Sequence, residues 1–399
     1  MKKLLMATAA TALMAGTAFA ESHGKEVKIG IILGFTGPLE SITPDMAAGA
    51  ELAMTEVNDA GSLLGGMKVT PVRADSTCID AAAASAAAER LITSDGVKGI
   101  MGADCSGVTG AIMSNVAVPN GVVMISPSAT SPALSHMNNE DNGLFFRTAP
   151  SDARQGVVMT DILMEEGVKE VAVSYVNNDY GKGLADSFQA AFEAAGGTVT
   201  ISAAHEDQKA DYSAEVGALA SAGGERLVVA GYVDGGGSGI VRAALDTGAF
   251  DTFQFVDGMV SDTLTAKFKG EIDGSMGQVP GSDSPGAAAF EKMAGDAFNP
   301  TGPFAKESYD AAALIMLAMQ AAGSTDPQVY KDKVMDVANA PGEEIFPGDL
   351  AKAIEILAGG GDIDYVGATA VELIGPGESA GNYRQITYKD GEEVTVKYR

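Results

Sequence analysis

The fold is decided by Ala103-Asp104-Cys105-Ser106-Gly107 and by Ile125-Ser126-Pro127-Ser128-Ala129-Thr130-Ser131-Pro132. Each stretch follows an apolar, β-favouring run, 97–101 and 122–125, and each leads into residues that bear hydroxyls or form turns. A strand that ends this way before a helix places hydroxyls and free backbone N–H groups at the carboxyl edge of a sheet, where open α/β sheets bind ligands. Helix capping alone explains either stretch about as well, so the rest of the chain must decide between the two.

The N-terminus predicts export. Lys2 and Lys3 precede an apolar stretch, 4–15, and Ala18-Phe19-Ala20 supplies a small-x-small cleavage pattern. These features are typical of a secretory signal peptide, 1–20, cleaved after Ala20. The apolar stretch is too short for a membrane span, so we expect an exported protein that is not embedded in the membrane.

Composition narrows the classes of partner. The 399 residues are enough for two domains, and the net charge is −27. Such acidity disfavours nucleic acid and anionic membranes as partners, since both are negative.

The two cysteines, Cys78 and Cys105, predict a disulfide in an exported protein, worth about 3–4 kcal/mol in the chain-entropy model. The three histidines are scattered, so no metal site is expected.

Strand-like and helix-like segments alternate in two similar series. The first has strands at 27–33, 67–72, 97–101 and 122–125, and the second at 171–175, 198–202, 226–230 and 253–256. Helical patterns separate the strands, which predicts parallel sheets. The last third reads as helices at 287–297, 308–322, 326–338 and 350–357, then a hairpin of 383–388 and 393–398 that turns at Asp390-Gly391.

The chain lacks familiar catalytic motifs. It contains no Gly-x-Ser-x-Gly elbow, Walker loop, dinucleotide fingerprint or His-Glu-x-x-His. Gly235-Gly236-Gly237-Ser238-Gly239 lacks the spacing of a phosphate loop and is interpreted as a flexible connector. In a disulfide, Cys105 would have no free thiol to act as a nucleophile. We therefore expect no enzyme activity and no cofactor.

Several short motifs, in this order, resemble one known family. They are Val27-Lys28-Ile29-Gly30, Gly37-Pro38, Asp75-Ser76-Thr77-Cys78, Cys105-Ser106, 125–134 and Asp179-Tyr180-Gly181-Lys182-Gly183. The chain resembles the periplasmic leucine/isoleucine/valine-binding proteins, the type I solute-binding subunits of ABC transporters. The resemblance implies two Rossmann-like α/β lobes with a ligand cleft between them and three crossovers, near Phe146, Val279 and Tyr365. One lobe would combine 21–146 and 281–364, and the other 147–280 and 365–399.

The resemblance also implies the ligand-binding residues. The first lobe would hold a ligand carboxylate with hydroxyl and backbone groups of Ser106, Ser128, Ala129 and Thr130. In the second lobe, Tyr180 and Tyr232 would cover the ligand and Asp257 would pair with its ammonium. Phe304 would form an apolar wall. A purely structural role stays open for four of these residues, which could be only turn or core residues: Tyr180, Tyr232, Asp257 and Phe304.

Two departures from the family pattern bear on the ligand. Asp257 stands where these binders usually carry Glu, and Glu40 adds a carboxylate near the cleft mouth. These departures bear on which amino acid is bound rather than on the class of ligand. The resemblance as a whole predicts a periplasmic binding protein that delivers a small, neutral or branched-chain amino acid to an inner-membrane ABC permease. The alternatives are a binder of a urea, an amide or a small aromatic acid, and a sensory module for a membrane receptor.

Overall fold

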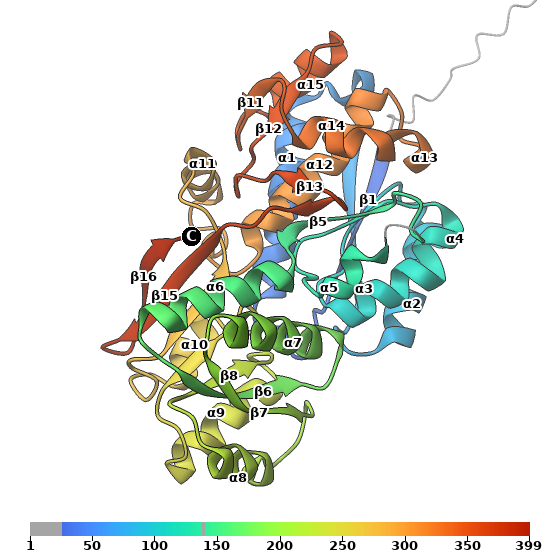
Figure 1. The fold of residues 1–399 in the computed structure, drawn as a ribbon. Helices are drawn as coiled ribbons and strands as arrows, with labels where there is room; N and C mark the ends of the chain where they lie inside the picture. The colour runs from blue at the N-terminus through green and yellow to red at the C-terminus, as the bar shows by residue number, and fades with distance from the viewer. Residues whose placement is uncertain (1–25, 138–139) are drawn as a thin grey trace, which may run out of the picture.

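The computed structural model describes residues 26–137 and 140–399, which form two helix-covered lobes (Figure 1). Each lobe contains a seven-stranded sheet. The predicted signal peptide, 1–20, lies outside the described residues. Within them, every helix is too short or too polar to cross a bilayer. The predicted α/β class with two similar lobes is confirmed.

The first sheet has the order β13-β14-β5-β4-β3-β1-β2. Its five parallel strands are β1 (Glu26–Leu33), β2 (Lys68–Asp75), β3 (Ile100–Gly102), β4 (Met124–Ser126) and β5 (Phe145–Pro150). The short strands β13 (Leu373–Ile374) and β14 (Glu378–Ser379) extend its edge. Helices before β5 are α1 (Thr43–Ala60), α2 (Ala81–Arg90), α3 (Ser106–Ile112), α4 (Val118–Asn120) and α5 (Pro132–Ser135).

The second sheet has the order β16-β15-β10-β9-β8-β6-β7. Its parallel strands are β6 (Glu170–Val176), β7 (Thr198–His205), β8 (Arg226–Ala230), β9 (Phe253–Phe255) and β10 (Met276–Pro280). The antiparallel pair β15 (Tyr383–Lys389) and β16 (Glu392–Tyr398) completes it. The helices here are α6 (Asp152–Glu165), α7 (Asp179–Ala194), α8 (Ser213–Ala222), α9 (Gly236–Thr247) and α10 (Asp262–Lys267).

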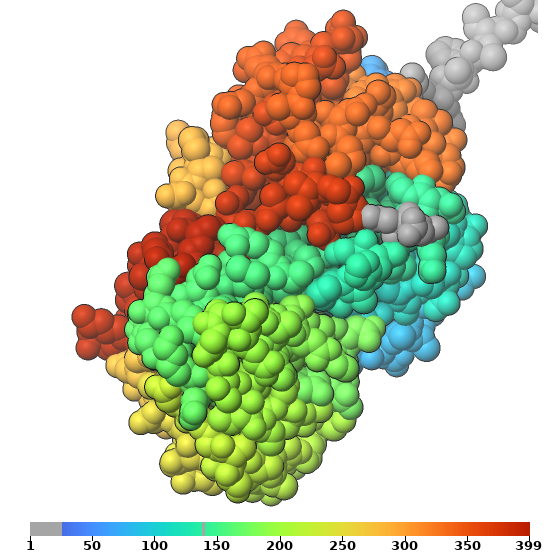
Figure 2. Space-filling model, in the orientation of Figure 1, coloured from blue at the N-terminus to red at the C-terminus, as the bar shows by residue number. Residues whose placement is uncertain are grey.

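The remaining elements follow β10. They are α11 (Pro285–Ala294), α12 (Ala305–Ala322), α13 (Pro327–Tyr330), α14 (Val334–Ala338), α15 (Leu350–Ala358) and a small parallel pair, β11 (Glu343–Ile345) and β12 (Ile363–Tyr365). The orange helices α12 and α14 lie beside the blue α1 and β1 (Figure 1), and in the space-filling view the orange segments form the end of the molecule opposite the yellow-green segments of the second lobe (Figure 2). Helix α12 is buried along nearly its whole length and packs on α1, where Gly49 is needed because a Cβ there would lie 2.2 Å from the Ala305 carbonyl oxygen.

Both sheets reverse their strand order at the same place. The first strand of each series, β1 or β6, lies between the second and third strands, so the order switches between β1 and β3 and between β6 and β8. Loops at the carboxyl ends of strands diverge at such a switch point and leave a crevice for a ligand. Ser106 and Tyr180 lie at the starts of the helices that follow β3 and β6, and Tyr232 lies in the loop after β8.

Sheet membership places the third crossover later than predicted. The first two crossovers follow β5 and β10, near the expected Phe146 and Val279. The third lies between β14 and β15, after Ser379. The expected boundary near Tyr365 is wrong because β13 and β14, which follow Tyr365, still belong to the first sheet. The reason is tertiary: β14 pairs with β5, and Glu378 accepts hydrogen bonds from the buried Arg147.

Elements with a clear local pattern form as predicted, and one expected helix does not. The apolar run 27–33 forms β1, whose interior is buried on both faces. The hairpin forms as expected, and both turn residues, Asp390 (φ 56°) and Gly391 (φ 77°), are left-handed. The expected helix 326–338 is instead broken into α13, a 3₁₀ turn and α14.

Candidate functional site

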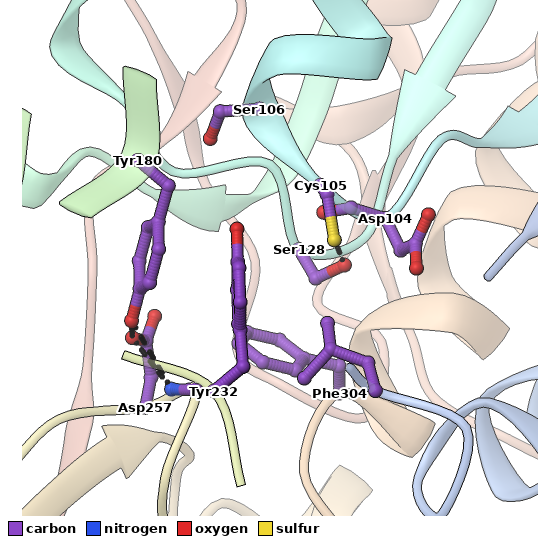
Figure 3. A pocket seen from close by; sticks show the side chains of 10 residues that line it. Asp104, Cys105, Ser106, Ser128, Tyr180, Tyr232, Asp257 and Phe304 are labelled. Atoms are coloured by element: carbon purple, nitrogen blue, oxygen red, sulfur yellow. Dashed lines mark hydrogen bonds between the residues drawn. The ribbon is translucent and has the colours of Figure 1, made fainter. Parts of the chain in front are cut away.

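A cavity lies between the lobes at the two switch points. It is lined by Leu39, Asp104, Cys105, Ser106, Ser128, Tyr180, Tyr232, Asp257, Gly258 and Phe304 (Figure 3). Six of the eight residues expected to bind ligand are among them, and Ala129 and Thr130 are not. The cavity volume is about 20 Å³, room for about one water molecule. The lobes are therefore closed over the site.

The first lobe contributes hydroxyl groups at the start of α3. Ser106 is the first helical residue, and its Oγ accepts a hydrogen bond from Ser131 N at 3.0 Å. That contact leaves the Ser106 hydroxyl hydrogen available as a donor. The Ser128 hydroxyl instead donates to the Asp104 carbonyl oxygen at 3.0 Å. Ser106 is thus better placed than the Ser128 hydroxyl to donate to an anion.

Asp104 is a lining residue that the sequence analysis missed. Its side chain is buried, and its carboxylate accepts hydrogen bonds from Gly34 N at 2.8 Å and from Ser76 Oγ at 2.7 Å. Burial raises the pKa of Asp104, and these hydrogen bonds oppose that rise. Its position directly after β3, two residues before Ser106, is the signal that could have identified it.

Ala129 and Thr130 lie behind the cavity wall. Ala129 N donates to Ser126 Oγ at 2.9 Å, and Arg147 Nη1 donates to the carbonyl oxygens of Ala129 at 2.9 Å and of Ser131 at 3.0 Å. Arg147 therefore holds the loop on both sides of Thr130. The Thr130 Oγ1 atom is buried and has no hydrogen-bond partner among the described residues.

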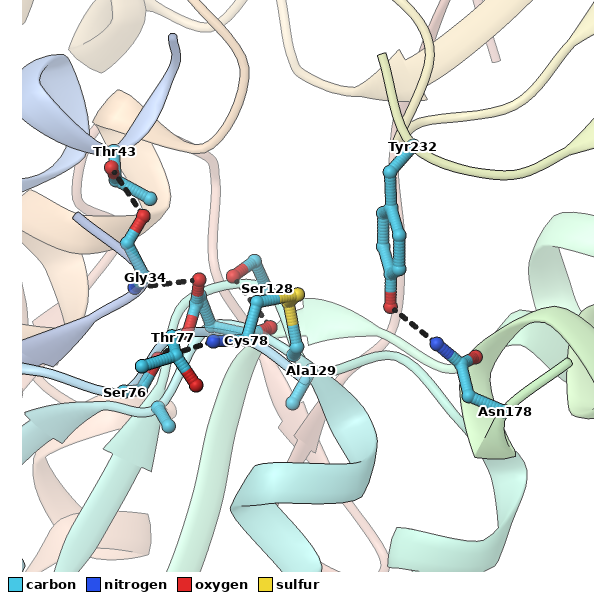
Figure 4. Close-up of a disulfide and its surroundings, with 12 residues drawn as sticks. Gly34, Thr43, Ser76, Thr77, Cys78, Ser128, Ala129, Asn178 and Tyr232 are labelled. Carbon is cyan, nitrogen blue, oxygen red and sulfur yellow. Dashed lines mark hydrogen bonds between the residues drawn. A yellow bond between two sulfur atoms is a disulfide. The ribbon is translucent and has the colours of Figure 1, made fainter. Parts of the chain in front are cut away.

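The second lobe contributes two stacked tyrosines and a carboxylate. The rings of Tyr180 and Tyr232 lie 5.1 Å apart at 17° (Figure 3). The Tyr180 hydroxyl donates to Asp257 Oδ1 at 2.5 Å, and Gly258 N donates to the same oxygen at 2.9 Å. Asn178 Nδ2 donates to the Tyr232 hydroxyl at 3.3 Å (Figure 4). The two rings form one wall of the cavity, and Asp257 lies at the end of the Tyr180 ring.

Asp257 is a buried carboxylate, only 1% exposed. Burial raises its pKa, while the hydrogen bonds that it accepts from the Tyr180 hydroxyl and from Gly258 N lower it. Its Oδ2 atom has no hydrogen-bond partner within the part of the chain that the structure describes. An acceptor in this condition is suited to a cationic or N–H-bearing group, since an unpaired buried charge is costly.

Apolar residues complete the wall on the first lobe. Phe304 adopts a left-handed backbone (φ 61°) at the N-cap of α12, a strained conformation for a residue with a large side chain. Such strain persists where surrounding structure imposes it, often at binding sites. Leu39 also lines the cavity, whereas its neighbour Glu40 is exposed and is not among the lining residues.

Cys78 and Cys105 form the predicted disulfide, with sulfurs 2.03 Å apart (Figure 4). It ties the loop after β2 to the start of α3, and Cys105 is both the N-cap of α3 and a lining residue. The cross-link therefore fixes the segment that presents Ser106.

Direct contacts hold the lobes together at the cleft rim. Asp234 of the second lobe accepts a hydrogen bond from Ser41 N at 3.0 Å on Oδ2, and its own N–H donates to the Pro38 carbonyl oxygen at 3.2 Å. A third bond joins Asn299 Nδ2 to Asp262 Oδ2 at 2.9 Å. None of these residues lines the cavity, so the rim contacts add to closure independently of a ligand.

Comparisons with known proteins agree with this architecture. Residues 26–342 match the periplasmic binding protein family. A Leu/Ile/Val-binding protein homologue of Brucella melitensis is 32% identical over 336 residues, which cover 81% of this chain and 87% of that protein. The leucine-binding protein of Thermotoga maritima superimposes with a TM-score of 0.78 at 21% identity, covering 93% of this chain and 98% of that one.

A third protein shows how widely the fold is used. A solute-binding protein of an ABC transporter from R. palustris, solved in complex with benzoate, has a TM-score of 0.73 at 18% identity, with 94% and 96% of the two chains covered. At this identity the likeness concerns the fold alone. The family match and the Brucella relative carry the assignment: this chain belongs to the leucine/isoleucine/valine-binding family of periplasmic solute-binding proteins.

Proposed function

We propose that this protein is the periplasmic, non-enzymatic binding subunit of an ABC importer and that it captures a small α-amino acid between its lobes. The observation that carries the proposal is the opposition, across one cavity, of the Asp257 carboxylate and the Ser106 hydroxyl at the N-terminus of α3. An α-amino acid offers an ammonium and a carboxylate on one carbon, and these two sides match its two charges.

Three remaining groups give the site its shape. Tyr180 and Tyr232 present an apolar ring surface with polar ends, and Phe304 faces them from the first lobe (Figure 3). The closed cavity has room for about one water molecule, so a hinge motion of the lobes would have to open it to admit a ligand. The Leu/Ile/Val-binding relative and the leucine-binding structure support an amino acid as the ligand class.

A small aromatic acid is the second candidate, since the benzoate-binding protein shares the fold. The charge of the cavity counts against it. The described lining residues include two carboxylates, Asp104 and Asp257, and no lysine or arginine. A ligand that carries only a carboxylate would leave Asp257 without a cation and would place a third negative charge nearby.

A thermal-shift and calorimetric screen against amino acids, ureas, amides and benzoate tests the proposal. A ligand at a hundredfold excess over its Kd should stabilise the protein by about 2.7 kcal/mol. Asp257→Ala should remove most of this shift, whereas Asp251→Ala, at an exposed position, should keep it. If the wild type binds an analogue without the amine as tightly as the amino acid itself, the amino-acid assignment fails. Loss of uptake of the same ligand in cells that lack the protein would test the transport role.

A further inference from the structure

A third buried carboxylate, Asp152, lies beside the site but was absent from the predicted binding residues. It is the first residue of α6, directly after the first crossover, and is 0% exposed. Its backbone N–H donates to the Thr130 carbonyl oxygen at 2.8 Å. Asp152 therefore joins α6 of the second lobe to the binding loop of the first.

One side-chain amide links Asp152 to Asp257. Gln155 Nε2 donates to Asp152 Oδ1 at 2.9 Å, and Gln155 Oε1 accepts from Asp257 N at 3.4 Å. Gln278 Nε2 donates to the same Gln155 oxygen at 3.0 Å, and Gln254 in turn donates to Gln278 at 2.7 Å. All three glutamines are fully buried, so this chain of amides holds Gln155 in one orientation between the two acids.

The two carboxylates are not equally supported. Asp257 Oδ1 accepts from Tyr180 and from Gly258 N, whereas the Asp152 carboxylate accepts from Gln155. In the described residues the Oδ2 atoms of both acids have no hydrogen-bond partner. Hydrogen bonds to a carboxylate favour its charged form, so Asp257 is the better anion and Asp152 the better place for a proton.

The groups that face this pair do not neutralise it. Arg147 of β5 is the nearby cation, and its charge lowers the pKa of Asp152. Its guanidinium, however, is hydrogen-bonded to Glu378, to the Ser135 hydroxyl and to the carbonyl oxygens of the binding loop, so burial and the Asp257 carboxylate still dominate. Three tyrosines face the pair, Tyr180 from α7, Tyr232 from the loop after β8 and Tyr383 from β15, and burial raises the pKa of each. The tyrosines stay neutral, so two buried negative charges would repel each other.

We propose that Asp152 is a positioning residue that holds a proton while the cleft lacks a cation and releases it when a ligand ammonium docks on Asp257. The inference rests on the proposed function. The O–H bond of the Asp152 carboxyl breaks, its proton passes to solvent, and the carboxylate that remains faces a site that has gained one positive charge. Burial and the neighbouring Asp257 carboxylate raise the pKa of Asp152 well above its ordinary value, and the ammonium offsets that repulsion.

Two measurable consequences follow. Binding of an amine-bearing ligand should release up to one proton per site. Its affinity should therefore rise with pH, by up to about tenfold per pH unit, until the pH exceeds the pKa of Asp152 in the ligand-free protein. An unreleased proton, or a flat affinity profile, means that Asp152 does not change its protonation state.

Isothermal titration calorimetry between pH 5.5 and 8, in buffers of different ionisation enthalpy, measures both consequences on the mature protein with the amino acid that binds in the screen. Asp152→Asn has nearly the shape of the protonated acid. We expect it to keep binding at pH 5.5, to release no proton from this site and to bind about tenfold more weakly than the wild type at pH 8. The wild type should release a proton that Asp152→Asn does not.

A matched control separates this pair from another buried acid. Glu307 is buried beside the second crossover, and burial raises its pKa to about 8, so it titrates near the upper end of the pH range of the calorimetry. Glu307→Gln should leave proton release intact. The inference is overturned if the wild type releases no proton, or if Glu307→Gln rather than Asp152→Asn abolishes the release. If no amino acid binds at any pH, the proposed function itself fails, which is a different result.

Discussion

The hydroxyl of Tyr180 donates a hydrogen bond of 2.5 Å to Asp257 Oδ1, and the two residues are 77 positions apart in the chain. The bond joins the loop after β9 to the start of α7. It orients the carboxylate so that Oδ1 is occupied and Oδ2 is free of partners among the described residues. One tyrosine thus both covers the cavity and orients the charge at its end.

Tyr180→Phe should weaken binding without unfolding the protein. The variant keeps the ring that stacks on Tyr232 but removes a hydrogen bond to a charged group, which is worth about 1.5–3 kcal/mol. Calorimetry should show a Kd about 10- to 100-fold higher. Tyr232→Phe is the matched control because the Tyr232 hydroxyl receives only the 3.3 Å bond from Asn178, so its Kd should change several-fold at most. Equal effects of the two variants would contradict the assigned role of Tyr180.

Removing the disulfide should lower both stability and affinity. The two cysteines are 27 positions apart, and cross-linking a loop of this size contributes about 3–4 kcal/mol in the chain-entropy model. Denaturant unfolding of the Cys78→Ala/Cys105→Ala double variant should show a loss of that order. Affinity should fall as well, because Cys105 caps the helix that presents Ser106. Unchanged binding in a folded double variant would show that α3 keeps its position without the cross-link.

The rim contact of Asp234 should stabilise the closed state. Asp234→Ala removes the acceptor for Ser41 N across the cleft, and Asp234 is not among the residues that line the cavity. We expect ligand dissociation to accelerate about 3- to 10-fold in stopped-flow measurements, since the variant lacks a hydrogen bond to a charged acceptor that stabilises only the closed state. The melting temperature of the ligand-free protein should stay near that of the wild type. A dissociation rate equal to that of Asp251→Ala would show that the rim contact does not contribute.

The buried carboxyl of Glu307 should make folding stability fall as pH rises. Its pKa is raised from 4.5 to about 8, mainly by burial. The unfolded chain then loses this proton at lower pH than the folded protein does. Stability from this group is therefore fully present below about pH 4.5 and is lost progressively up to about pH 8, at no more than about 1.4 kcal/mol per pH unit. Denaturant titrations at pH 5, 6.5 and 8 should show this fall in the wild type, and Glu307→Gln should flatten it. A fall of equal size in the variant would assign it to other groups.

The sequence by itself determined the regular elements and the residues that end them. Apolar runs such as 27–33 are typical of strands covered on both faces, and hydroxyl-rich stretches such as 103–107 and 125–132 mark where those strands end. Ordered motifs then indicated the family, and with it six of the lining residues, including Ser106, Tyr180 and Asp257. These features are local or follow a pattern along the chain, so they can be read without coordinates.

Only the tertiary structure decided which distant groups meet. Burial of Asp104 and Asp152 depends on neighbours such as Ser76, Gln155 and Gln278, which no local pattern connects to them. The third crossover depends on β14 pairing with β5, a contact between strands more than two hundred residues apart. The left-handed backbone of Phe304 likewise comes from how α12 enters the core. The burial of charged side chains, the strained backbone of Phe304 and the positions of the crossovers depend on long-range packing. The strands and their ends depend on short stretches of sequence.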